Sequence, residues 1–220
     1  YSAYGSPVDK LSGMVDTSFA QPNGWVRTSV PDGNGGWYIG GNFSEVGGEP
    51  RSRLAQIDAS GNVTAWNPSP NSTVHSIAVS GSTVYVGGNF SAIGGVDRNR
   101  IAAIDALTGT PTDRDPSASS SVRALTASGS IVYAGGYFQS IGGQNGLGLA
   151  AIDSTTGNAT NWNPSPNEAV FSIAVSGSNV YVGGFFSNIG GKFRRRLAAL
   201  DASTGNATSW NPIVDQGTTA

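Results

Sequence analysis

Six arginines stand in three pairs, and each pair comes shortly before an apolar run of four or five residues. The pairs are Arg51 with Arg53, Arg98 with Arg100, and Arg194 with Arg196. A guanidinium group donates several hydrogen bonds in a fixed planar fork that fits carboxylates and phosphates. A ring of such pairs would therefore make a binding site for an anionic ligand.

Tryptophan recurs at a second fixed position, as Trp66, Trp162 and Trp210. One repeat carries Arg114 at this position, and Gly146 and Gly148 take the place of an arginine pair. If each aromatic packs on the arginines of the next repeat, both departures fall at one contact, where arginine beside arginine would repel. We therefore expect cation–π stacks between these tryptophans and the arginine pairs. The alternative is an arginine ring that stays free to bind an anion.

Catalytic candidates are few. The chain has one histidine, His75, and no cysteine, so a thiol nucleophile and a cysteine-based metal site are excluded. Aspartate recurs after the third apolar run of every repeat, as Asp58, Asp105, Asp153 and Asp201. A single active site does not need four equivalent carboxylates, whereas the turn that follows each of them offers backbone amides to bind. We expect no catalytic residue, no metal and no cofactor.

These residues are placed by a repeat whose clearest copy is residues 180–191, with the sequence VYVGGFFSNIGG. The first glycine pair of each copy begins at Gly40, Gly87, Gly135 and Gly183, so the spacings are 47, 48 and 48 residues. Such a period indicates one supersecondary unit that is stacked several times.

Each repeat contains four short segments rich in Val, Ile, Thr, Tyr or Trp, which predict strands. Examples are residues 74–79, 84–88, 101–105 and 207–210. Four antiparallel strands in about 48 residues are typical of a β-propeller blade. Tight turns join the first strand to the second and the third to the fourth. The two longer connections of each blade then fall on one end, which we predict to be the working face.

The predicted fold is all-β: a β-propeller of four full four-stranded blades and an N-terminal half-blade. The blades are residues 25–72, 73–120, 121–168 and 169–220, and the half-blade is residues 1–24. Phe19 stands at the tryptophan position of the half-blade. Three arrangements would complete the half-blade: a larger propeller, a four-bladed ring with an added pair of strands, or a second copy that supplies the missing strands.

Composition narrows the partners. Charged residues make up 12% of the chain and the net charge is -2, so no strong field favours nucleic acid. No run of 18 apolar residues predicts a membrane span. Residues 1–13 lack the basic start and apolar centre of a signal peptide, so the signal of an exported protein would lie outside this segment.

The repeat resembles the bacterial delta-60-type repeat propellers, through VYVGGNF at residues 84–90, RNRIAAID at residues 98–105 and WNP at residues 162–164. The resemblance covers residues 8–212 and implies a propeller of an exported or surface protein. Residues 199–210 have a looser likeness to quinoprotein dehydrogenase propellers, although Trp210 lies one residue further on than the tryptophan of those propellers. The glycine pairs also resemble kelch repeats, without the kelch tryptophan spacing.

We therefore expect a non-catalytic module, extracellular or on the cell surface, that binds or assembles a protein or surface partner. One alternative is a lectin with sugar sites between blades; another is a quinoprotein-like or hydrolytic enzyme. Self-association and continuation of the propeller beyond this segment are further possibilities. Trp25 and Trp37 occur only in the first blade, and we expect them to fill the core rather than form a sugar platform.

Overall fold

The first three segments of every repeat form a three-stranded antiparallel sheet with the second strand in the middle. The structure is a computed structural model that describes residues 14, 16, 18–146 and 148–212. The strands of the four sheets, in order along the chain, are β1 (Trp25–Pro31), β2 (Trp37–Asn42) and β5 (Leu54–Ile57); β6 (Val74–Ser80), β7 (Thr83–Gly88) and β10 (Ile101–Asp105); β11 (Val122–Ser128), β12 (Ile131–Gly136) and β15 (Leu149–Asp153); β16 (Val170–Ser176), β17 (Asn179–Gly184) and β20 (Leu197–Asp201).

The fourth segment of each blade is shorter than predicted. It makes one isolated antiparallel bridge to the third strand, as between Ile104 and Pro111 or between Leu200 and Ala207. The threonine that follows adds one backbone hydrogen bond, for example from the Thr208 amide to the Ala199 carbonyl. The chain then leaves the sheet at the tryptophan position, because the proline two residues later, after Asn or Asp, cannot continue the ladder.

The second glycine pair of each repeat closes a small hairpin, where the sequence pattern predicts only a longer connection. In the second blade, Gly94 and Gly95 have φ angles of 59° and 75°, so both occupy the left-handed region that a type I′ hairpin turn requires. The hairpin strands are β3 (Glu45–Val46), β4 (Glu49–Pro50), β8 (Ala92–Ile93), β9 (Val96–Asp97), β13 (Ser140–Ile141), β14 (Gln144–Asn145), β18 (Asn188–Ile189) and β19 (Lys192–Phe193).

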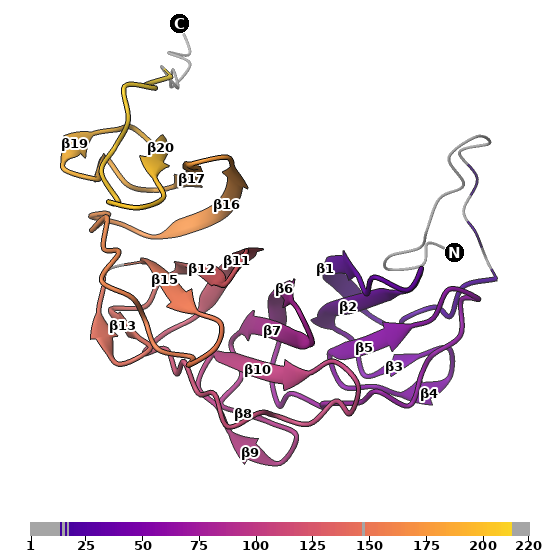
Figure 1. Cartoon of the computed structure of the whole chain (residues 1–220). Coiled ribbons are helices and arrows are strands. Elements are labelled where there is room, and N and C mark those ends of the chain that lie inside the picture. The colour runs from indigo at the N-terminus through magenta and orange to yellow at the C-terminus, as the bar shows by residue number, and fades with distance from the viewer. Residues whose placement is uncertain (1–13, 15, 17, 147, 213–220) are drawn as a thin grey trace, which may run out of the picture.

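The four sheets stand side by side in an open arc, with β1, β6, β11 and β16 on its concave side (Figure 1). The hydrophobic core consists of layers between neighbouring sheets. Val86 and Tyr38, for example, lie in one layer between the first two blades, and Tyr133 and Val182 lie in the layer between the last two. All-β propeller architecture is thus confirmed, and the inter-blade layers carry most of its apolar burial.

In the first three blades, the first glycine of the strand-end pair allows this close stacking. A Cβ atom on Gly87 would lie 2.7 Å from the Cγ1 atom of Val122 in the next blade, and one on Gly40 would lie 2.5 Å from Val74. Glycine is therefore required here by the approach of the neighbouring blade.

A further apolar layer covers the face of the first blade that is turned away from the second blade. Phe19 and Ala20 pack against the buried cluster that contains Phe43 and Ile57. Phe19 lies over Gly61, as Trp66 lies over Gly109 one blade later. Most of the predicted half-blade, residues 1–13, lies outside the described residues. The described residues contain no helix long and apolar enough to cross a membrane.

Candidate functional site

The first arginine of each pair is bound by the backbone of its own blade. The guanidinium groups of Arg51, Arg98 and Arg194 donate to the carbonyl oxygens of Thr64, Thr112 and Thr208, at 2.6, 2.9 and 2.6 Å. Each also donates to the carbonyl of the residue before it. These arginines connect the small hairpin to the fourth segment, and Arg194 is only 8% exposed.

The second arginine of each pair has an unusual backbone. Arg53, Arg100 and Arg196 have φ angles of 62°, 64° and 65°, and Gly148 has 63° at the equivalent position of the third blade. A glycine there is explained by the left-handed conformation, which glycine adopts without strain. The side chains of Arg53 and Arg100 also donate to backbone carbonyls, those of Pro70 and Asn89.

The indoles of Trp66 and Trp162 lie between blades, 4% and 7% exposed. Their Nε1 groups donate to the carbonyl oxygens of Asp105 and Asp201 in the next blade, at 3.1 and 3.0 Å. Tyr38 packs on Trp66 with ring centroids 4.8 Å apart. The structure thus gives these tryptophans the next blade's aspartate turn as their partner, in place of the predicted arginine pairs.

Arg114, at the tryptophan position of the second blade, also connects its blade to the aspartate turn of the next blade. Its Nε donates to the carbonyl of Thr155 at 2.8 Å and one terminal nitrogen donates to Oγ1 of Thr83 at 2.9 Å. Trp210, at the end of the last blade, is 42% exposed, with Tyr181 at a centroid distance of 5.4 Å. The predicted site residues are therefore not gathered into one site: most of them serve the scaffold.

The recurring aspartates hold turns, as the sequence indicated. Oδ1 of Asp201 accepts hydrogen bonds from the amides of Ser203 and Thr204 and from both hydroxyls. These bonds, led by the one from the Ser203 hydroxyl, lower the pKa of Asp201 to about 2. Asp105 and Asp153 accept equivalent bonds, which also lower their pKa values.

A different set of residues projects where the innermost strands begin. In every sheet the first strand carries a β-bulge near its start, at the third residue of β1 and at the second residue of β6, β11 and β16, so one side chain leaves the ladder. The bulge residues and the residues that follow the first glycine pair together form what we term the axial row. Its members are Arg27, His75, Arg123 and Phe171 at the bulges, and Asn42, Asn89, Tyr137 and Phe185 after the glycines.

The axial row is aromatic at the end formed by the third and fourth blades. The rings of Tyr137 and Phe171 have centroids 5.3 Å apart, and those of Phe171 and Phe185 are 4.8 Å apart. Arg123 lies over Tyr137 with its Cζ atom 5.5 Å from the ring centroid. Phe185 is 61% exposed and Tyr137 is 48% exposed. Aromatic faces beside a cation, open to solvent, are typical of a binding surface.

The row is polar and cationic at the end formed by the first and second blades. His75 is partly buried, and its Nε2 atom has no hydrogen-bond partner within the described structure. Burial first, and then the positive charges of Arg123 and Arg27, lower the pKa of His75 to about 4. Asn89 lies beside the imidazole and opposes this shift, and it accepts a hydrogen bond from Ser121 at 2.7 Å. An acid–base catalyst needs a pKa close to the working pH, and these surroundings move the pKa of His75 away from neutral pH.

We expect an NMR titration of the His75 ring protons to give a pKa near 4, against about 6.5 for an unfolded histidine. Because the folded value is the lower one, the stability from neutral His75 is present above about pH 6.5 and is lost as the pH falls towards 4. Arg123→Gln should raise the pKa by removing one neighbouring charge. An unchanged value in that variant, or a wild-type pKa at 6.5, would contradict this account.

The axial row was not among the site residues predicted from the sequence. The sequence does contain a signal for the row: two positions, 15 residues apart in the first repeat and 14 in the others, form a different pair in each repeat, such as Arg123 with Tyr137 and Phe171 with Phe185. The bulge that turns the first of them outward is visible only in the paired strands. In the described part of the chain, no three His, Asp or Glu side chains lie close enough together to hold a metal ion.

Comparison with known proteins is consistent with this scaffold. The crystal structure of the computationally designed Ika4 protein matches with a TM-score of 0.52 and 15% sequence identity, over 82% of this chain and 92% of that one, which concerns the fold alone. A search of curated proteins gave no match. Residues 27–212 match the family described as outer membrane protein assembly factor BamB. Since this match covers most of the chain, the protein belongs to the BamB propeller family.

Proposed function

We propose that this protein is a non-catalytic binding module that holds a segment of a partner protein along the axial row. The observation that carries the proposal is the aromatic group of Tyr137, Phe171 and Phe185, in which Tyr137 and Phe185 are exposed and Arg123 lies over the ring of Tyr137. Large exposed aromatics next to an arginine are the residue types that supply most of the affinity in protein interfaces. The family's description as an assembly factor supports a protein partner.

The chemistry of the row defines the partner segment. Apolar side chains of the partner would cover Phe171 and Phe185, and carboxylates would lie towards Arg123 and Arg27. Near neutral pH His75 is uncharged and adds no positive charge of its own. We therefore infer a partner segment that combines acidic and apolar residues. It would bind along the axial row, where β1, β6, β11 and β16 begin.

The proposal accounts for the residues that do not recur. Most of the recurring arginines, tryptophans and aspartates make hydrogen bonds within or between blades, as Arg98, Trp66 and Asp201 do. The axial row is the set whose chemistry changes from blade to blade, and a specific partner requires such differences. For an enzyme, His75 would need a carboxylate beside it, but the charges that act on it come from arginines.

A lectin with sugar sites between blades is less well supported, because Trp66 and Trp162 are buried there. The expectation that Trp25 and Trp37 fill the core is wrong: they are 65% and 39% exposed. The exposed indole of Trp25 stands at the start of β1, on the same end as Arg27, and would extend the surface for a protein partner. We further propose that the module is of the delta-60-type repeat group and works outside the cell or at its surface.

A phage-displayed library of random 12-residue peptides tests the proposed function. We expect wild-type protein to enrich peptides that combine acidic and apolar residues, with binding at least tenfold weaker to the double variant Phe171→Ser/Phe185→Ser. The matched control is Phe193→Ser, since Phe193 is 64% exposed but lies on β19, away from the row. Equal enrichment by the double variant and the wild type would refute the assignment.

A further inference from the structure

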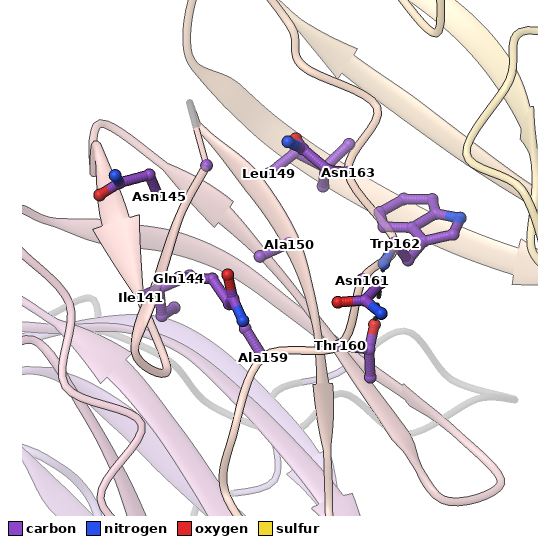
Figure 2. A pocket seen from close by; sticks show the side chains of 11 residues that line it. Ile141, Gln144, Asn145, Leu149, Ala150, Ala159, Thr160, Asn161, Trp162 and Asn163 are labelled. Carbon is purple, nitrogen blue, oxygen red and sulfur yellow. Dashed lines mark hydrogen bonds between the residues drawn. The ribbon is translucent and has the colours of Figure 1, made fainter.

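A cavity of about 190 Å³ opens in the third blade, between the β13–β14 hairpin and the fourth segment. Figure 2 shows Gln144 on one side of it and Asn161 and Trp162 on the other. This volume has room for several water molecules. Its wall also includes Gly146 and Thr160, so it is lined with polar residues as well as apolar ones.

The cavity stands where the other three blades place an arginine. The amides of Arg51, Arg98 and Arg194 donate to the serine that begins the hairpin region, and the Gly146 amide donates to Gln139 in the same position. Gly146 is therefore the structural equivalent of these arginines. In the other blades the guanidinium fills this place, and the Nε atoms of all three arginines are buried without a hydrogen-bond partner, which indicates one shared conformation.

The acceptors for such a group are still present in the third blade. The carbonyl of Thr160 corresponds to those of Thr64, Thr112 and Thr208, which each accept a hydrogen bond from an arginine. The carbonyl of Asn145 corresponds to that of Asp97, which accepts the second bond from Arg98. A Cβ atom on Gly146 would have only the Leu149 carbonyl nearby, at 3.8 Å, so the space is open from the glycine outward.

We propose that this cavity is a binding site for a guanidinium group, namely an arginine side chain presented by a partner protein. The acceptors are carbonyl oxygens arranged to receive two donors of one planar group, which arginine offers and lysine does not. The chain's own arginines show the bound geometry three times. The site shares no residue with the axial row and does not depend on the function proposed for it.

The second blade, where Arg98 occupies this place, also predicts which substitution would raise the affinity for a guanidinium group. Arg98 has the carboxylate of Asp115 at 3.9 Å, and the equivalent residue of the third blade is Asn163, which lines the cavity. Asn163→Asp therefore adds the missing charge, and an exposed ion pair of this kind raises affinity up to about fivefold.

The test is an NMR titration of the full chain with N-ethylguanidinium chloride, followed at the amides of Gly146 and Thr160 and at the indole of Trp162. We expect saturable shifts at these signals in the wild type, tighter binding in Asn163→Asp, and at least tenfold weaker binding in Gly146→Arg, which fills the site. Arg98→Gly should create a second site whose shifts centre on Thr112. Ethylammonium chloride, which has no planar fork, serves as the control ligand.

Three results would overturn the proposal. No saturable shift in the wild type would mean that the cavity takes no guanidinium. Equal shifts with ethylammonium would mean that it responds to any cation. Shifts at Gly146 and Thr160 that persist in Gly146→Arg would place the ligand elsewhere. Dispersed indole signals establish that each variant is folded, and Asn163→Asp keeps the test decisive if Gly146→Arg does not fold.

Discussion

Trp66→Ala should lower the free energy of unfolding by about 3–5 kcal/mol. The indole of Trp66 is 4% exposed, packs on Tyr38 and donates to the Asp105 carbonyl of the next blade. Truncation leaves a cavity in the layer between two blades and removes one inter-blade hydrogen bond, so both contributions have the same sign. Urea unfolding followed by far-UV circular dichroism measures the loss.

Trp210→Ala is the matched control for this prediction. Trp210 stands at the same position of the last blade and also packs on a tyrosine, Tyr181, but it is 42% exposed. We expect its removal to lower the free energy of unfolding by about 1 kcal/mol, the typical size of a change outside a packed core. Equal losses in the two variants would contradict the claim that inter-blade burial, rather than the tryptophan–tyrosine pair, provides the stability.

Gly87→Ala should destabilise the protein by about 1–3 kcal/mol, the usual effect of overpacking a core. The added Cβ atom would lie 2.7 Å from Oγ of Ser76 in its own blade and 2.7 Å from Cγ1 of Val122 in the next. The serine hydroxyl can rotate away, whereas Val122 is fully buried and held by the neighbouring sheet. The same unfolding experiment reports the change.

Gly183→Ala separates these two contacts. A Cβ atom on Gly183 would meet Oγ of Ser172 at 2.5 Å, as at Gly87, but no side chain of a following blade lies near it within the described structure. We expect a change within about 0.5 kcal/mol. A loss as large as that of Gly87→Ala would show that this face of the last blade is covered in solution. A loss that grows with protein concentration would identify a second copy as the cover.

Both comparisons depend on one feature, the repetition of the same layer between successive sheets. The sequence predicted that feature well because its causes are local. Alternating apolar residues, glycine pairs and aspartate turns are each set within a few residues along the chain, and a fixed period of 47 or 48 residues then requires the units to stack. The Asp201 turn and the strands around Gly183 follow directly from these patterns.

The sequence predicted the contacts of the non-recurring residues less well, and Arg114 and Gly146 show the reason. From the sequence, the two residues were predicted to lie at one contact between neighbouring blades. In the structure Arg114 reaches the turn at Thr155, Gly148 adopts the left-handed conformation, and Gly146 leaves a cavity. Three separate causes produced what looked like a single substitution pattern, and only the positions of the backbone carbonyls distinguish them.

The sequence alone determined the three main strands of each blade, the repeat and the turn residues, because hydrophobic period and glycine conformation act over short distances along the chain. It could not determine which polar side chains remain available for a ligand, because that depends on neighbours brought together from different blades. Tertiary structure engages Arg98 and Trp66 in the scaffold through carbonyls 14 and 39 residues away. It also leaves Phe185 exposed beside the bulged Phe171 and leaves the space beside Gly146 open, and these positions carry the proposed recognition.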